Sequence, residues 1–202
     1  MEQFNKAMSG ITSSSSMAII QDYDFKDAKV VCDIGGGNGL NLALILKHYP
    51  GTKGMVLDMP SVVVDTVKVF EDLQISDRTE AVGGSFFEPL PASFKVCDTF
   101  ILKIILHDWG DADSIKILKN IADSMDSGER ILIGDCAIDT AGSSMETGKV
   151  LMDINMMSVN TLGARERTVE EFSSLLQAAG LKFGRHVPLR GTLISVIEGF
   201  KA

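Results

Sequence analysis

Several features are scarce in this 202-residue sequence, and each shortage excludes a class of protein. No apolar run approaches the roughly 18–20 residues that a membrane span needs, and the first ten residues lack the basic-then-apolar order of a signal peptide. The 19 basic residues are outnumbered by 27 acidic ones, which gives a net charge of −8 and disfavours nucleic-acid binding. The three cysteines form no CxxC pair and lie in apolar runs, which predicts buried reduced thiols at Cys32, Cys97 and Cys136 in a cytoplasmic protein.

Two common catalytic patterns are also missing. Only three histidines occur, with no HxxxH pair and no clustered carboxylates, so no metal site is predicted. A GxSxG nucleophile elbow is absent as well, which argues against a serine hydrolase. The apolar fraction of 45% is nevertheless sufficient for a sizeable core, so the chain is interpreted as one globular domain.

Apolar runs and amphipathic segments alternate from about residue 29 onward, which predicts strands alternating with helices. A capping box at Thr168 and Glu171 opens a last helix that stops at Gly180. The predicted fold class is α/β: a Rossmann-like, doubly wound, mostly parallel seven-stranded sheet with an antiparallel C-terminal hairpin. The predicted strands are 29–34, 53–58, 79–83, 98–105, 130–135, 182–189 and 192–200, and the other helices are 40–48, 60–73, 111–125 and 145–160.

Residues 1–28 do not follow this alternation. Their spaced apolar side chains predict helix pieces that pack on the core. The expected organisation is therefore a helical N-terminal segment over residues 1–28, followed by one catalytic or binding domain over residues 29–202.

Four glycines in five positions follow the first strand, from Gly35 to Gly39. Glycine allows a tight turn and a close approach of the backbone to a ligand, and the carboxyl edge of an open α/β sheet is where ligands bind. Asp58 ends the second strand, where a carboxylate can accept both hydroxyls of a ribose. A tight turn and a strand-end aspartate before Pro60 are the simpler alternatives, but together the two features predict a site for an adenosine-containing cofactor.

The dinucleotide fingerprint GxGxxG fails in this loop. Its last position would need glycine or alanine, but the two possible registers place Leu40 or Leu42 there. This disfavours an NAD(P)-dependent oxidoreductase, although the residues alone do not separate nicotinamide cofactors from S-adenosylmethionine.

His107 follows directly on the fourth strand, at the same sheet edge as the glycine loop. A histidine whose pKa stays near 6.5 is largely neutral at pH 7 and suits a general base; capping or packing is the alternative. Asp135 at the end of the fifth strand, or Glu166 before the last helix, could accept a proton from the imidazole and fix its tautomer. Glu166 could instead pair with Arg165 or Arg167 on the surface.

Five motifs, in this order and spacing, resemble the S-adenosylmethionine-dependent O-methyltransferases of the caffeate, isoflavone and hydroxyindole type. They are Asp33-Ile-Gly-Gly-Gly-Asn-Gly39, Leu57-Asp-Met-Pro60, Val82-Gly-Gly-Ser-Phe-Phe87, Leu106-His-Asp-Trp109 and Arg165-Glu-Arg-Thr168. The resemblance spans nearly the whole chain but only the family's catalytic domain. Family members usually carry an N-terminal dimerisation domain, which implies a homodimer for the full-length protein.

The resemblance also implies roles for individual residues. His107 matches the catalytic base, and Glu166 and Asp135 stand at the flanking acids. The implied cofactor contacts are Asp33, Gly35, Gly36, Gly37, Gly39, Asp58, Met59, Ser85, Phe86, Lys103 and Trp109, and the implied substrate contacts are Met8, Met152, Met156 and Asn160.

The expected reaction is methyl transfer from S-adenosylmethionine, which leaves S-adenosylhomocysteine, to a hydroxyl of a small aromatic substrate. His107 removes the phenolic proton in this hypothesis. The alternative is a fragment that binds the cofactor without catalysis because the dimerisation domain is missing. Neither nucleic acid nor a membrane is an expected partner.

Overall fold

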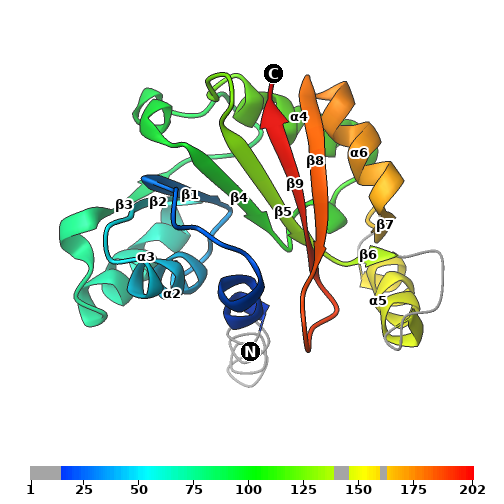
Figure 1. The fold of residues 1–202 in the computed structure, drawn as a ribbon, viewed down its shortest axis with the longest axis horizontal. Helices are drawn as coiled ribbons and strands as arrows, with labels where there is room; N and C mark the ends of the chain where they lie inside the picture. Colours follow the sequence, from blue (N-terminus) through cyan, green and yellow to red (C-terminus); the bar gives the residue numbers. More distant parts are fainter. Residues whose placement is uncertain (1–14, 139–145, 160–162) are drawn as a thin grey trace.

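The computed structural model describes residues 15–138, 146–159 and 163–202. Seven strands form one sheet in the order β3-β2-β1-β4-β5-β9-β8 (Figure 1). The first five strands are parallel, and β9 inserts antiparallel between β5 and the edge strand β8. The strands are β1 Val30–Ile34, β2 Lys53–Asp58, β3 Thr79–Gly83, β4 Thr99–Lys103, β5 Arg130–Asp135, β8 Leu181–Pro188 and β9 Ser195–Lys201. This confirms the predicted fold class.

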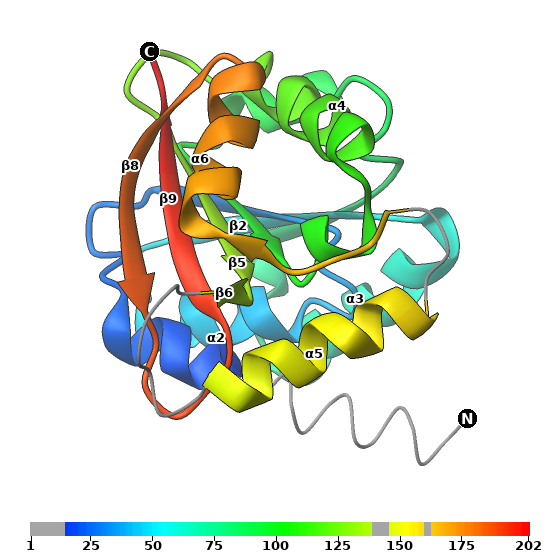
Figure 2. The ribbon, with the colours of Figure 1, turned by 90° about the vertical axis from the view of Figure 1, so that its right-hand side faces the viewer.

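Helices cover both faces of the sheet, with α4 and α6 on one side and α2 and α3 on the other (Figure 2). Residues 15–22 are also helical, and their buried side chains join the core on the α2 side. A small second sheet pairs β6 Ala137–Ile138 with β7 Arg167–Thr168. The helices are α2 Leu40–His48, α3 Pro60–Asp72, α4 Asp111–Ala122, α5 Glu146–Val159 and α6 Val169–Ala178, and a short 3-10 turn, η3, spans Leu106–Asp108.

Local sequence signals explain most of the element boundaries. Pro60 opens α3 because its missing N–H is not needed in a first helical turn. Thr168 and Glu171 form the predicted capping box, and Gly180 follows α6 in the left-handed region. The fourth strand is shorter than predicted and ends at Lys103, because Ile104 turns the chain with φ 57°. This left-handed conformation is costly for a β-branched residue, and it lies at the sheet edge that carries the predicted site.

The cysteine prediction was wrong for two of the three residues. Cys32 on β1 and Cys97 before β4 form a disulfide, whereas Cys136 is a buried free thiol. Both bonded cysteines are fully buried in the core, where apolar surroundings alone had indicated three separate thiols. Their proximity comes from the pairing of β1 with β4, which joins segments 65 positions apart.

Within the described residues, no helix combines the length and the apolar character that crossing a membrane requires.

Candidate active site

The glycine loop connects β1 to α2 at the point where the strand order reverses between β1 and β4. Gly35 and Gly37 have φ values of +73° and +58°, a region that residues with a Cβ adopt only with strain. A Cβ at Gly35 would lie 2.6 Å from Ile105 Cδ1, whereas one at Gly37 would meet nothing within 4 Å. The loop therefore needs glycine for its shape at both positions, and at Gly37 it also leaves open space for a ligand.

Asp58 at the end of β2 holds this loop directly. Its Oδ2 accepts a hydrogen bond from the Gly37 N–H at 2.8 Å, and its Oδ1 accepts one from the Met59 N–H at 2.7 Å. A carboxylate offers about four acceptor positions, so two remain for a ligand. The sequence predicted Asp58 as a ligand contact, but it did not show that the same carboxylate orders the loop.

A pocket opens between the carboxyl ends of β1 and β4. Ligands bind at such switch points because the loops diverge there and leave a crevice. The lining includes four of the predicted cofactor contacts in or beside the loop, together with Lys103; the full set is Asp33, Gly35, Gly36, Gly37, Asn38, Asn41, Lys103, Ile104 and Ile105. The structure thus brings residues from β1, α2 and β4 to one site.

Asp33 is buried in this pocket beside polar groups that the sequence did not reveal. Asn41 Nδ2 donates to Asp33 Oδ2 at 3.0 Å, and Asn41 Oδ1 has no partner in the described part of the chain. Burial raises the pKa of Asp33 to about 6, and it lowers that of Lys103. Lys103 Nζ lies 3.3 Å from Ser15 Oγ. In the sequence, the contact between Asn41 and Asp33 could be suspected only because Asn41 is a polar residue on the buried face of α2.

His107 lies in η3, and its ring is almost completely buried. Its Nδ1 is 3.1 Å from Glu166 Oε1, whose side chain is fully buried as well. Its Nε2 is 3.8 Å from Asp108 Oδ1. The Arg165 N–H donates to the His107 carbonyl at 3.0 Å, so the segment before β7 contacts both the ring and the backbone of this histidine.

Asp135 does not contact the imidazole through a hydrogen bond. Its Oδ2 accepts from the Leu106 N–H at 3.2 Å, and its Oδ1 has no partner among the described residues. Burial raises the pKa of Asp135 to about 6. Of the two acids that the sequence left open as partners of His107, the structure therefore places Glu166 on the ring and Asp135 on the backbone of the same turn.

The surroundings of His107 change its pKa strongly. Burial lowers the pKa, but the hydrogen bond to Glu166 and the negative charge of Asp135 together raise it to about 9. The free protein therefore holds an imidazolium at pH 7, contrary to the neutral ring that the unperturbed value predicts. The group is a stronger base than an isolated histidine, and it becomes available as the pH rises.

Aromatic side chains pack together beside the site. Trp109 makes edge-to-face contacts with Phe86 and Phe87, at ring-centroid distances of 6.1 Å and 4.6 Å. Ser85 is exposed, and its hydroxyl accepts from the Phe87 N–H at 3.2 Å. Met59 is 59% exposed at the start of α3. These predicted cofactor contacts lie near the carboxyl ends of β2, β3 and β4, but outside the residues that line the pocket itself.

The predicted substrate contacts fall partly on α5. Met156 is buried and Met152 is half-buried, whereas Met8 and Asn160 lie outside the described residues. The neighbouring Asp153 accepts a hydrogen bond from the Glu166 N–H at 2.9 Å. This hydrogen bond connects helix α5 to the segment that carries Glu166, the residue that contacts the His107 ring. The sequence did not indicate this connection.

Comparison with known proteins decides the family. A family model described as an O-methyltransferase domain matches residues 1–182. This chain belongs to the O-methyltransferase family. The resemblance seen in the five motifs is thereby confirmed.

Individual O-methyltransferases agree with this assignment. The chain is 37% identical to a phenazine O-methyltransferase of Lysobacter antibioticus, over 96% of this chain and 55% of that protein. It is 35% identical to a caffeic acid 3-O-methyltransferase of Ammi majus, over 89% of this chain and 47% of that protein. The chain thus spans about half the length of these relatives.

A solved structure shows the same fold. An O-methyltransferase from neocarzinostatin biosynthesis, in complex with S-adenosylmethionine and 2-hydroxy-5-methyl naphthoic acid, matches with a TM-score of 0.85 and 29% identity. The match covers 98% of this chain and 57% of the other.

Proposed function

We propose that this domain transfers a methyl group from S-adenosylmethionine to a hydroxyl of a small aromatic substrate, with His107 as the general base. The observation that carries this proposal is the buried His107–Glu166 pair at the same sheet edge as the glycine loop. Membership of the O-methyltransferase family, and the aromatic compounds in the names of its relatives, support the reaction class.

The pocket fits the chemistry of S-adenosylmethionine. Asp33 in the pocket offers a carboxylate, Asp58 offers a second one beside it on the Gly37 N–H, and Asn41 Oδ1 has no partner among the described residues, so the site suits ammonium and hydroxyl donors. The diphosphate of a nicotinamide dinucleotide would instead meet the negative charge of Asp33, which disfavours the oxidoreductase alternative. When bound, S-adenosylmethionine supplies an electrophilic methyl group on a sulfonium.

The protein's part is to accept a proton from the hydroxyl that becomes methylated. In the neutral imidazole, Nδ1–H donates to Glu166 Oε1, which leaves the lone pair of Nε2 to accept that proton. Glu166 and Asp135 then stabilise the imidazolium that forms. A positioned base of this kind contributes about 10²–10⁴-fold to the rate. Met152 and Met156 offer adaptable apolar surface for an aromatic ring.

We further propose the organisation that the family resemblance implies. Residues 29–202 form the catalytic domain, residues 1–28, of which 15–28 are described, pack on it as a helical segment, and the full-length protein is a homodimer. The Cys32–Cys97 disulfide removes the reduced-thiol argument for the predicted cytoplasmic location. The excess of acidic residues supports the absence of nucleic-acid binding. Across the described ranges, no cluster of three or more His, Cys, Asp or Glu side chains is arranged to hold a metal ion.

Two measurements test the function. Calorimetric titration with S-adenosylhomocysteine and with NAD distinguishes the cofactor classes, and we expect only the former to bind. Transfer of labelled methyl from S-adenosylmethionine to matched phenols, anilines and benzoates then identifies the acceptor, and we expect the phenols to react. Binding of NAD alone would overturn the cofactor, and cofactor binding without transfer to any acceptor would favour the inactive-fragment alternative.

The role of Glu166 has its own signature in the pH dependence. The pKa of His107 is about 9, so methyl transfer by the wild type should increase with pH until His107 is deprotonated. Glu166→Gln keeps the size of the side chain but removes the charge that stabilises the imidazolium. We expect the rising limb of the pH–rate profile to shift down by about one pH unit or more. Exposed Glu170 provides the matched control, Glu170→Gln, and equal profiles for the two variants would contradict the assignment.

A further inference from the structure

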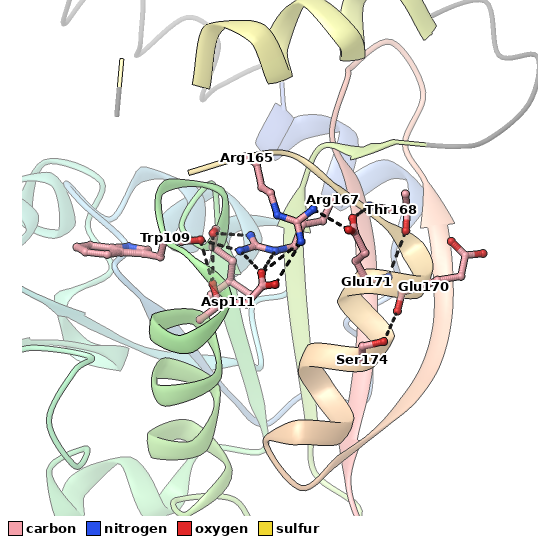
Figure 3. A network of polar contacts seen from close by, with 10 residues as sticks. Trp109, Asp111, Arg165, Arg167, Thr168, Glu170, Glu171 and Ser174 are labelled. Atoms are coloured by element: carbon pink, nitrogen blue, oxygen red, sulfur yellow. Dashed lines mark hydrogen bonds and ion pairs between the residues drawn. The ribbon is translucent and has the colours of Figure 1, made fainter. Parts of the chain in front are cut away.

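Among the residues that the structure describes, Arg167 has the largest fully buried side chain. Its guanidinium donates to two backbone carbonyls, from Nη1 to Leu106 O at 2.8 Å and from Nη2 to Trp109 O at 2.7 Å (Figure 3). Nε and Nη2 also donate to Asp111 Oδ1, at 3.0 Å and 2.8 Å. The planar fork thus joins three acceptors along one stretch of chain.

Those two carbonyls flank His107. Leu106 precedes it and Trp109 follows two residues later, so the guanidinium spans the η3 turn from both ends. Glu166, which contacts the imidazole, is the residue immediately before Arg167. One short segment therefore supplies both the carboxylate on the ring and the clamp on the turn that carries the ring.

The neighbouring Arg165 belongs to the same motif, but its side chain is partly exposed and makes different contacts. Its side chain is 36% exposed, and it pairs with Glu171 at 2.6 Å and with Asp111 at 3.3 Å. Exposed pairs of this type contribute little, about 0–1 kcal/mol. Figure 3 shows the two guanidiniums converging on Asp111, but only that of Arg167 donates to the carbonyls of the turn.

A buried cation needs a reason, because removing it from water costs several kcal/mol. Asp111 is half-exposed, so its charge compensates only part of that cost. The Leu106 carbonyl also accepts from the Trp109 N–H at 3.2 Å, and the Ser114 hydroxyl reaches both carbonyls at 3.5 Å and 3.3 Å, so Arg167 adds the shorter bonds to each. An apolar side chain could not add these bonds, and a lysine could not present a planar fork to three acceptors. The geometry therefore requires an arginine for the shape of the turn rather than for core packing.

We propose that Arg167 is a positioning residue, which clamps the Leu106–Trp109 turn so that His107 Nδ1 stays in hydrogen-bonding contact with Glu166. This inference rests on the proposed function, since it assigns the clamp to the general base of methyl transfer. It does not require Arg167 to touch substrate or cofactor.

The charges around His107 allow positioning to be distinguished from a simple charge effect. Asp108 on the same turn, Asp135 at the end of β5 and Glu166 face the imidazole with negative charge. Arg167 is the buried cation beside the turn, and the partly exposed Arg165 is a second one. If Arg167 acted only as a charge, its loss would raise the pKa of His107 by removing a repulsive cation. If it positions the ring against Glu166, its loss lowers that pKa.

The test is Arg167→Lys, which retains the charge but loses the fork, with Arg165→Gln as the matched control. NMR titration of the histidine side chains, with His107 assigned through His107→Gln, needs no methyl acceptor. We expect Arg167→Lys to lower the pKa of His107 by about one unit, a tenfold change in protonation equilibrium. With the best acceptor, kcat on the pH-independent plateau above the pKa of His107 should fall about 10–100-fold, while KM for S-adenosylmethionine stays within about threefold. Arg165→Gln should leave both the protonation equilibrium constant of His107 and kcat within about twofold of the wild-type values.

An unchanged or raised pKa in folded Arg167→Lys overturns the inference, whatever the acceptor panel shows. If no acceptor reacts while the pKa still falls, the proposed function fails and the clamp stands. Should Arg167→Lys not unfold cooperatively, Asp111→Asn replaces it, because Asp111 accepts two of the four bonds. Exposed Asp113 in the same helical turn gives the control Asp113→Asn. We expect kcat to fall about 3–10-fold in the first variant only, and equal kcat values overturn the inference.

Discussion

Replacing His107 with glutamine is expected to reduce methyl transfer to below a few per cent while leaving the affinity for S-adenosylhomocysteine nearly unchanged. Glutamine can still donate a hydrogen bond to Glu166, so the buried carboxylate keeps a partner. It cannot accept a proton at neutral pH, and a phenol with a pKa near 10 then attacks without a base. The expected loss is about 10²–10⁴-fold in kcat.

The measurement combines steady-state kinetics with calorimetric binding. His48→Gln is the matched control, since His48 is an exposed histidine at the end of α2, remote in the sequence from η3. That variant should retain wild-type kinetics. Activity above a few per cent in folded His107→Gln would show that another group removes the proton, or that the acceptor needs no base.

The second large effect is expected on cofactor binding. Asp58→Ala should weaken S-adenosylhomocysteine binding about 10–100-fold, because hydrogen bonds to a charged group contribute about 1.5–3 kcal/mol. Two losses combine in this variant. The ligand loses a carboxylate acceptor, and the Gly37 N–H loses the bond that shapes the glycine loop.

Asp98→Ala provides a close control for that variant. Asp98 also accepts from backbone N–H groups, those of Lys29 at 2.8 Å and Val30 at 3.3 Å, but it does so at the opposite edge of the sheet. Both variants should lose stability in urea unfolding, whereas only Asp58→Ala should lose cofactor affinity. Wild-type affinity in Asp58→Ala would leave Asp58 as a turn residue before Pro60.

The helices and strands could be predicted closely because their signals are local. Helix α2 begins at Leu40 and ends at His48 as the apolar spacing indicated, and the capping box places the start of α6. The glycine loop and Asp58 could be assigned to one sheet edge, since the carboxyl ends of parallel strands share it. The place of β9 between β5 and β8 was not predictable, because the choice of an edge for a hairpin depends on contacts between distant segments.

The site shows where local signals end. From the sequence, Glu166 had two readings, a partner of His107 or a surface partner of Arg165 or Arg167. In the structure both arginines turn to Asp111, and Glu166 is buried against the imidazole. The disulfide between Cys32 and Cys97 and the interaction of Asn41 with Asp33 likewise depend on neighbours that no local pattern identifies.

The sequence by itself determined the fold class, the position of the glycine loop and the presence of a histidine at the same sheet edge. Periodicity, turn residues and chain direction suffice for these features. Only the tertiary structure decided which acid faces His107, how far its pKa is raised and which arginine holds its turn. Burial removes water from these groups, and the energy of a charge then depends on the few atoms that replace it.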